Sequence, residues 1–403
     1  RALKNNITSM LKEISSCSVG SDGVTRLPFT EEHKRALKII TKWMVDSGLS
    51  TRIDDAGTLI GKYNGPKNAP TFLVGSHQDS VINGGMFDGI MGVLLPLIAI
   101  RNLNNLPYNI EFLAFADEEG IRFPTSLLGS RALAGTLSPT VLNLKDNQGL
   151  SIRDAIKNLN LVPENIFNLK REKQKYLGFL EVHIEQGPIL YNKNLPLGTV
   201  SSISGIERHD LSIYGLSSHA GTMPMKYRKD ALCAASEIIL MSEKLASNCS
   251  NAVATVGMLN IQPNVANVIP EKANLILEVR SGSDVERENL SSNIIKNVND
   301  IINRRKLEVT INKTYEQSAT KCDNDLQLML SDSLDDAAGY KFHLDSGATH
   351  DASAISDLCP ISMLFVRCKN GISHNPEEEA SEEDMALAVK VIENFFKRLS
   401  TII

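Results

Sequence analysis

The chain has 403 residues, with 42 Lys and Arg against 47 Asp and Glu, which gives a formal net charge of −5. Hydrophobic residues make up 42% and charged residues 22%, and these proportions exclude a largely disordered or collagen-like chain. At about 100–200 residues per domain, the length predicts two domains. The mild acidity argues against a nucleic-acid binder, because phosphate binding needs a basic face.

The sequence also bears on membranes and on the cellular compartment. The longest apolar stretch, residues 89–100, is too short to span a bilayer and contains Pro96, so no membrane partner is expected. Six cysteines are scattered without a C-x-x-C pair, which favours free thiols in a reducing compartment. We therefore expect a cytoplasmic protein. Since the sequence begins with Arg1, a trimmed targeting peptide stays an open alternative.

The first predicted elements are a helix and a set of buried strands. Residues 29–48 have the apolar spacing of an amphipathic helix, with Leu37, Ile40 and Trp43 on one face and Gly48 at its end. Four near-continuous apolar runs then occur at residues 71–75, 110–116, 178–182 and 360–366. Such runs are typical of parallel strands buried on both faces. Ligands bind at the carboxyl ends of such strands, so the residues just past each run are of interest.

Between the third and fourth runs, residues 205–318 have a different pattern. A strand is followed by a helix, two strands, a helix and a strand. The last five of these are expected near residues 228–246, 253–261, 272–280, 284–305 and 306–315. This β-α-β-β-α-β order is that of a ferredoxin-like domain. We therefore predict an inserted domain, 205–318, within a discontinuous α/β domain formed by residues 1–204 and 319–403.

An acidic run at residues 377–384 precedes the last expected helix. We interpret it as a solvated loop followed by a helix start, with Ser381 as the N-cap and acidic side chains in the first turn. This interpretation gives the run no chemical role.

Each strand run is followed by residues that can bind metal. These residues, together with an aspartate in the turn GGMFDG, are His77, Asp88, Glu118, Glu119, His183 and His374. Imidazole and carboxylate groups are ligands of zinc and similar ions. Asp88 has two oxygens, enough to bridge two metals about 3.5–4 Å apart. Asp79, two residues after His77, is expected to accept the second ring N–H of that histidine and fix its tautomer.

The adjacent pair Glu118 and Glu119 suggests a division of labour. Neighbouring residues that leave a strand point in different directions, so one carboxylate can bind metal while the other faces the substrate. A carboxylate beside an activated water can act first as a general base and then as a general acid.

Six motifs resemble those of the M20-type di-metal amidohydrolases. They are GSHQDS, GGMFDG, DEEG, EVHIEQGP, SSHAGTMPM and GISHNP. The most similar branch is that of the N-carbamoyl-L-amino acid hydrolases, with the allantoate amidohydrolases and beta-ureidopropionases, and the resemblance runs from about residue 20 to 395. It implies a mixed-sheet, metallopeptidase-like catalytic domain. It also implies that residues 205–318 form a lid and dimerisation domain, and hence a homodimer.

The resemblance implies two divalent metal ions per subunit. One would be held by His77, Asp88 and His183, and the other by Asp88, Glu119 and His374. Glu118 would be the base, and His350 would either support the site or have a structural role. Zinc suits this mixed ligand set, and manganese, cobalt or nickel would also fit.

The resemblance further implies residues that contact substrate. His219 matches a lid histidine that reaches the partner subunit's active site and polarises the scissile carbonyl. Asn267 and Arg280 match positions that bind a substrate carboxylate, which a guanidinium fork suits. Gln186 and Gly347 match positions near the substrate.

The implied activity is hydrolysis of the ureido C–N bond of N-carbamoyl-L-amino acids, which yields an amino acid, carbon dioxide and ammonia. The expected partner is thus a small ureido compound with a carboxylate. Three alternatives stay open: an allantoate amidohydrolase, a dipeptidase or aminoacylase, and a non-catalytic metal-binding protein. Glu118 beside a full ligand set argues against the last of these.

Overall fold

A computed structural model describes residues 7–20, 22–173 and 175–403. The chain divides into two compact units. Unit 1 comprises Arg1–Ser201, Cys322–Leu344 and Ala348–Ile403, and unit 2 comprises Ser202–Lys321 and Asp345–Gly347. Unit 1 contains a mixed sheet and unit 2 an antiparallel one, so the predicted α/β fold class is confirmed. The predicted domain boundaries, and the roles of catalytic domain and lid, stay predictions.

The sheet of unit 1 has the strand order β1-β2-β4-β3-β5-β13-β6. Its strands are β1 (Ser50–Ile53), β2 (Leu59–Tyr63), β3 (Thr71–His77), β4 (Asn109–Phe115), β5 (Tyr176–Ile184), β6 (Leu197–Ile203) and β13 (Ile361–Val366). The four strands β4, β3, β5 and β13 are parallel neighbours. They contain the four apolar runs, which confirms that prediction. Their carboxyl ends therefore meet at one edge of the sheet.

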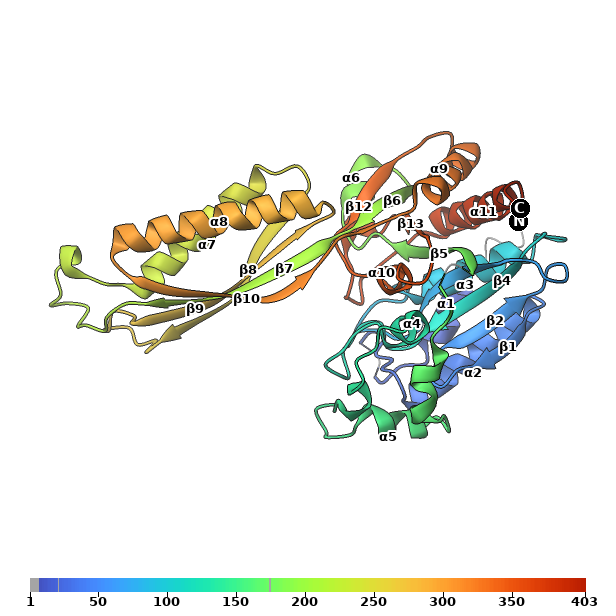
Figure 1. Ribbon diagram of the computed structural model, residues 1–403, viewed down its shortest axis with the longest axis horizontal. Helices are drawn as coiled ribbons and strands as arrows, with labels where there is room; N and C mark the ends of the chain where they lie inside the picture. Colours follow the sequence, from blue (N-terminus) through green and yellow to red (C-terminus); the bar gives the residue numbers. More distant parts are fainter. Residues whose placement is uncertain (1–6, 21, 174) are drawn as a thin grey trace. The chain divides into compact units, whose positions relative to one another are not determined.

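Helices cover both faces of this sheet (Figure 1). One face packs against α2 (Glu31–Asp46), α3 (Ile90–Ile100), α9 (Asn324–Ala338) and α11 (Glu382–Leu399), and the other against α4 (Leu128–Ala134) and α10 (Asp351–Ile355). The helix α1 (Ile7–Ser15) packs against α3 and α11. The remaining helices are α5 (Ile152–Lys157) and α6 (Ile189–Lys193). Because both faces are buried there, the central strands β3, β4, β5 and β13 are mostly apolar, whereas the edge strand β1 is largely exposed. Each fully buried Leu, Val or Phe contributes about 1.5–3 kcal/mol to folding.

Helix starts follow local hydrogen bonding. The predicted first amphipathic helix is α2, and the side chain of Thr30 accepts the N–H of His33 at its start. The expected N-cap Ser381 is confirmed, since its hydroxyl accepts the N–H of Asp384 in α11. The helix α3 is buried on all sides and follows Gly89, whose φ of +72° suits glycine.

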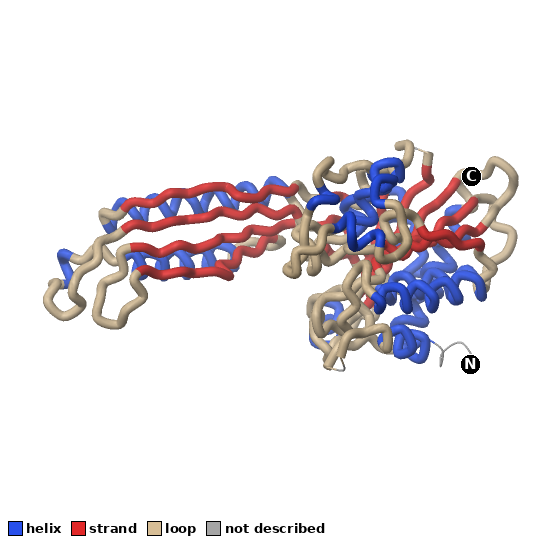
Figure 2. The backbone as a smooth tube through the Cα atoms, turned by 90° about the horizontal axis from the view of Figure 1, so that it is seen from below, coloured by secondary structure: helices blue, strands red, loops and turns tan. Residues whose placement is uncertain are grey.

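Unit 2 has the predicted order of elements. These are β7 (Gly205–Tyr214), α7 (Ala231–Ser247), β8 (Ala252–Gln262), β9 (Lys272–Ser281), α8 (Asp284–Arg305) and β10 (Glu308–Gln317). The sheet order is β10-β7-β9-β8, with every pair antiparallel. Figure 2 shows the four strands side by side, with both helices on one face. Buried and half-buried residues alternate along β9, because only one face packs against helices.

Two short strands complete the fold. They are β11 (Thr320–Lys321) and β12 (His343–Ser346). Every helix in the described part of the chain is too short or too polar to cross a membrane.

Candidate metal centre

The carboxyl edge of the parallel strands gathers the predicted ligands. His77 is the last residue of β3, and His183 lies near the end of β5. The two glutamates Glu118 and Glu119 follow β4, and His374 follows β13. Asp88 stands in the turn before α3. Neighbouring parallel strands thus bring side chains that are distant in the sequence to one place.

Asp88 lies at the centre of this group. Its Oδ1 is 3.2 Å from Nε2 of His77 and 3.1 Å from Nε2 of His183. Its Oδ2 is 3.1 Å from Nε2 of His374. Glu119 completes this side, with Oε1 3.5 Å from Nε2 of His374. The carboxylate of Asp88 therefore separates two clusters of donors, as a bridging ligand would.

The partners of Nδ1 in His77 and His183 indicate the protonation of the Nε2 atoms that face Asp88. Nδ1 of His77 lies 2.9 Å from the carbonyl oxygen of Asp79, and Nδ1 of His183 lies 2.9 Å from that of Ile184. A carbonyl oxygen only accepts, so Nδ1 carries the proton in each ring. In the neutral imidazole, both Nε2 atoms then direct a lone pair at Oδ1 of Asp88, which has no hydrogen-bond partner among the described residues. A positive charge is needed between these atoms, and the donor set fits a divalent cation.

The pKa shifts of the site residues also indicate a place for a cation. Burial raises the pKa of Asp88, but the imidazoles of His183, His374 and His77 outweigh it and hold the pKa well below its usual value. Burial lowers the pKa of His77, yet nearby carboxylates, Glu118 foremost, raise it well above its usual value. Asp88 and Glu119 raise the pKa of His374 to about 10. The anionic centre thus attracts protons, and a metal cation would replace them.

Glu118 stands beside the ligands with a distinct environment. Its side chain is 8% exposed, and its Oε2 lies 3.6 Å from Nε2 of His77. Burial raises its pKa well above the usual value; the charge of His77 opposes this shift and that of Glu119 adds to it. A raised pKa suits a group that takes up and returns a proton.

Among the residues that the structure describes, three sets of side chains have ligand atoms within 4.8 Å of one another, and each could hold a metal ion. They are His77, Asp88 and His183; Asp88, Glu119 and His374; and His77, Glu118 and Glu119. The first two are the ligand sets predicted from the sequence. The third includes the predicted base, so geometry alone leaves Glu118 able to bind metal as well.

The role of Asp79 differs from the expectation. The main-chain carbonyl of Asp79, not its carboxylate, is the close partner of His77, since the nearer carboxylate oxygen is 3.6 Å from Nδ1. The carboxylate instead accepts the N–H groups of Glu118 and Glu119 at 3.0 and 3.1 Å. Asp79 therefore fixes the peptide that carries both glutamates.

Two more predicted residues lie at this edge of the sheet. The ring of His350 packs edge-on against that of His183, with centroids 4.6 Å apart, and burial lowers the pKa of His350 well below its usual value. This ring contact fits the predicted supporting role of His350, which stays a prediction. Nε2 of Gln186, a predicted substrate contact, lies 3.1 Å from Oδ2 of Asp88 and 3.2 Å from Oγ of Ser373.

The sequence interpretation missed two buried glutamates. Glu378 belongs to the acidic run that was interpreted as solvated, yet it is 4% exposed and accepts the N–H groups of Phe87 and Asp88 at 3.0 Å. That interpretation was wrong for this residue, because contacts with the turn before α3 bury it. Glu181, fully buried on β5, accepts the hydroxyl of Ser76 at 2.7 Å. Its position two residues before His183 was the only available signal.

The other predicted residues lie in unit 2. Nη1 of Arg280 donates to the carbonyl of Gly347 at 3.0 Å, so the structure brings these two together. Nε of Arg280 also pairs with Glu278 at 2.6 Å. The loops of His219 and Asn267 meet, since the N–H of the residue after His219 donates to the carbonyl of Asn267 at 2.9 Å.

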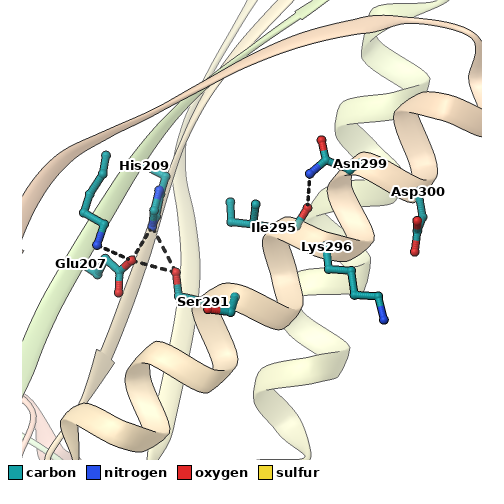
Figure 3. A pocket seen from close by; sticks show the side chains of 9 residues that line it. Glu207, His209, Ser291, Ile295, Lys296, Asn299 and Asp300 are labelled. Carbon is teal, nitrogen blue, oxygen red and sulfur yellow. Dashed lines mark hydrogen bonds and ion pairs between the residues drawn. The ribbon is translucent and has the colours of Figure 1, made fainter.

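Unit 2 holds a second cluster of titratable groups, which lines a cavity of about 560 Å³ (Figure 3). Glu207, His209 and Ser291 are the residue types of a hydrolase triad. However, Nε2 of His209 contacts both Oε1 of Glu207, at 2.8 Å, and Oγ of Ser291, at 3.1 Å. A triad histidine uses one nitrogen for each partner. We therefore assign no catalysis to this cluster.

Comparisons with known proteins agree with this geometry. A profile described as Peptidase family M20/M25/M40 matches residues 73–398. An N-carbamoyl-L-amino acid amidohydrolase from Geobacillus stearothermophilus is 37% identical over 377 residues, which cover 92% of each protein. Allantoate deiminase 2 from Glycine max is 34% identical over 434 residues, which cover 99% of this chain and 90% of that protein.

A solved structure extends the similarity over the whole fold. The crystal structure of an amidase of the hydantoinase/carbamoylase family from Burkholderia multivorans has a TM-score of 0.91 and 29% identity, and the match covers 98% of this chain and 97% of that one. Together with the site, these matches define a metal-binding hydrolase that acts on C–N bonds. The chain belongs to peptidase family M20/M25/M40, which confirms the predicted family and the prediction of an enzyme.

Proposed function

We propose that this chain hydrolyses the ureido C–N bond of N-carbamoyl-L-amino acids, with two divalent metal ions in each subunit. One observation carries the proposal: two imidazole Nε2 atoms face the same oxygen of Asp88, and Glu118 lies 3.6 Å from one of them, that of His77. The similarity to the Geobacillus stearothermophilus amidohydrolase supports the choice of substrate.

Five side chains would hold the ions. One ion would lie among His77, Asp88 and His183, and the other among Asp88, Glu119 and His374. When bound, the ions would polarise the ureido carbonyl and lower the pKa of the attacking water. Zinc is our choice for this mixture of imidazole and carboxylate, and manganese, cobalt and nickel are the alternatives to test.

Glu118 would carry the proton. As the water oxygen forms its bond with the carbamoyl carbon, the carboxylate of Glu118 takes the proton that the water releases. The C–N bond to the amino acid then breaks, and Glu118 returns the proton to the leaving nitrogen. The products are the amino acid and carbamate, which decays to carbon dioxide and ammonia.

His219 has the tautomer that its proposed role requires. Its Nδ1 accepts the N–H groups of Gly221 and Thr222 at 3.0 and 3.2 Å, so the proton of the neutral ring lies on Nε2. An exposed Nε2–H is a donor for the oxyanion that forms from the carbonyl. We propose that it acts in the site of a partner subunit, in a homodimer formed through unit 2.

Substrate recognition would use further residues. Arg280 and Asn267 would bind the carboxylate, with Gln186 and Gly347 close to the substrate. Closure of unit 2 as a lid would then couple recognition to catalysis. A cytoplasmic location also stays a prediction.

Allantoate is the second candidate substrate. The observation that favours it is the similarity to allantoate deiminase 2 from Glycine max, which extends over 99% of this chain. Allantoate also carries a carboxylate and ureido groups, so the same side chains would serve.

Parallel assays separate the candidates. The zinc-loaded protein would be given N-carbamoyl-L-methionine, allantoate, N-acetyl-L-methionine and a dipeptide, with a chelator-treated sample as the control. We expect zinc-dependent ammonia release from N-carbamoyl-L-methionine. Faster release from allantoate would favour the second candidate. Cleavage of the acetyl compound or the dipeptide, with no ammonia from either ureido compound, would contradict the proposal.

A further inference from the structure

Glu378 connects two metal-binding loops that are far apart in the sequence. Its Oε1 accepts the main-chain N–H groups of Phe87 and Asp88, both at 3.0 Å. Its Oε2 accepts the hydroxyl of Ser373 at 2.9 Å, and Ser373 directly precedes His374. One buried carboxylate thus contacts the main chain of one predicted ligand and the neighbour of another.

These contacts belong to a closed ring of hydrogen bonds. The amide group of Gln186 has two protons, one for Oδ2 of Asp88 at 3.1 Å and one for Oγ of Ser373 at 3.2 Å. Because the oxygen of Ser373 accepts from Gln186, its own proton is available for Glu378. Every donor in the ring has an acceptor. The ring closes through Asp88, because its main-chain N–H donates to Glu378 and its Oδ2 accepts from Gln186.

Strained main chain occurs at one member of the ring, Gln186, and at His374, the neighbour of the ring member Ser373. Gln186 and His374 have φ values of +59° and +55°, in the left-handed region that non-glycine residues rarely adopt. Such conformations persist only where surrounding contacts fix them. Gly85 permits the close approach, since a Cβ there would overlap the carboxylate of Glu378.

The two predicted metal positions depend on this ring to different degrees. His77 and His183 are fully buried at strand ends, and main-chain carbonyls fix their rings. His374 lies on a loop and its side chain is 49% exposed. The position formed by Asp88, Glu119 and His374 therefore relies more on the ring.

We propose that Glu378 is a positioning residue that orients Asp88 and His374, and so keeps the metal ion at the position formed by Asp88, Glu119 and His374. This inference rests on the two-metal centre of the proposed function. The ion between His77 and His183 should depend on Glu378 much less.

The variant Glu378→Gln tests the inference. The amide oxygen can still accept from Asp88, but the amide nitrogen would face Ser373, which already receives a proton from Gln186. Ser373 can accept this second proton only if its own hydroxyl proton turns away, so that proton loses its acceptor in the ring and the charged acceptor of the wild type is gone, which weakens the ring. Glu379→Gln is the matched control, because Glu379 is exposed, lies on the same loop and pairs only at the surface with Lys369.

Zinc binding is the measurement. Titration of the metal-free proteins in competition with a chromophoric chelator gives both dissociation constants, and elemental analysis gives the stoichiometry. We expect Glu378→Gln to bind one zinc ion as the wild type does and the second about 10–100-fold more weakly. Its turnover should be lost at low free zinc and recover in excess zinc, which a general loss of folding would not allow. Glu379→Gln should bind both ions normally.

Wild-type affinity for both ions in Glu378→Gln would overturn the inference, as would an equal weakening of both. If that variant does not fold, Ser373→Ala removes the two ring bonds of its hydroxyl but leaves Glu378 bound to the N–H groups of Phe87 and Asp88, so it should weaken the second ion by a smaller factor; unchanged binding there would also count against the inference. The zinc titrations and the elemental analysis do not depend on which substrate the protein hydrolyses. A wild type that binds two zinc ions but releases no ammonia from ureido compounds would refute the proposed function alone.

Discussion

Gly89 lies so close to the imidazole of His77 that a Cβ atom on Gly89 would overlap that ring. The φ of Gly89 is +72°, which an L side chain also disfavours. The turn before α3 therefore needs glycine for two reasons, and one of them concerns a predicted metal ligand directly.

Gly89→Ala is expected to displace His77 and weaken zinc binding. Gly339→Ala is the control, because Gly339 has a similar φ of +77° and a Cβ added there would meet no atom within 4 Å. Gly339→Ala should lose about 1–2 kcal/mol of stability from left-handed backbone strain, and Gly89→Ala at least as much, because the ψ of −59° at Gly89 lies outside the left-handed helical region. Only Gly89→Ala should also lose zinc, as measured by elemental analysis. Normal zinc content in Gly89→Ala would show that the close approach of Gly89 to the ring of His77 does not matter for zinc binding.

Glu118→Gln is expected to retain both metal ions and lose turnover by about 10²–10⁴-fold, because the amide cannot take up the proton of the attacking water. Elemental analysis and ammonia release measure the two properties separately. Near-wild-type turnover would refute the assignment of Glu118 as base. Loss of one ion would instead favour the third ligand set, in which Glu118 binds metal.

Arg280→Ala is expected to raise KM for N-carbamoyl-L-amino acids by about 10–100-fold, since hydrogen bonds to a charged group contribute about 1.5–3 kcal/mol. Arg208→Ala is the matched control, because Nε of Arg208 pairs with the other oxygen of Glu278 at 2.5 Å. That variant should leave KM unchanged. The carboxylate anchor is ruled out if both arginine variants have the KM of the wild type.

His33 gives a pH-dependent contribution to stability. Burial lowers its pKa to about 4, and its Nδ1 accepts the N–H of Phe29 at 2.8 Å. As the pH falls through about 6.5, the unfolded chain takes up a proton that folded His33 resists, so stability is lost between about pH 6.5 and pH 4. At pH 5 the loss from this residue should be about 2 kcal/mol.

His33→Asn keeps an acceptor for Phe29 and removes the titration. Urea denaturation at pH 8 and pH 5 should show a smaller loss of stability in this variant than in the wild type, by about 2 kcal/mol. Equal losses in the two proteins would show that His33 does not resist protonation.

The sequence could predict that the candidate ligands lie together because strand ends are local features. A buried parallel strand is a continuous apolar run, and His77, His183 and His374 each follow one, so their meeting at one sheet edge needed only the fold class. The order of elements in unit 2 was predictable for a similar reason, since helices and strands differ in apolar period.

The hydrogen-bond partners were not predictable in the same way. Spacing alone placed the carboxylate of Asp79 near His77, but the turn presents its carbonyl instead. The acidic run that includes Glu378 has the composition of a solvated loop, and contacts with Phe87 and Asp88, the latter 290 residues away, help to bury that one carboxylate. Such contacts depend on side-chain packing between distant segments, which has no local pattern.

That separation of 290 residues has a consequence for how the protein acquires its metals. A ribosome releases the N-terminal half first, so Asp88 emerges long before Ser373, His374 and Glu378. A nascent chain that lacks β13 and the loop after it presents only part of the ligand set. Assembly of the proposed centre would thus wait for the end of translation, and cation uptake at the position of His374 would be a step of maturation rather than of early folding.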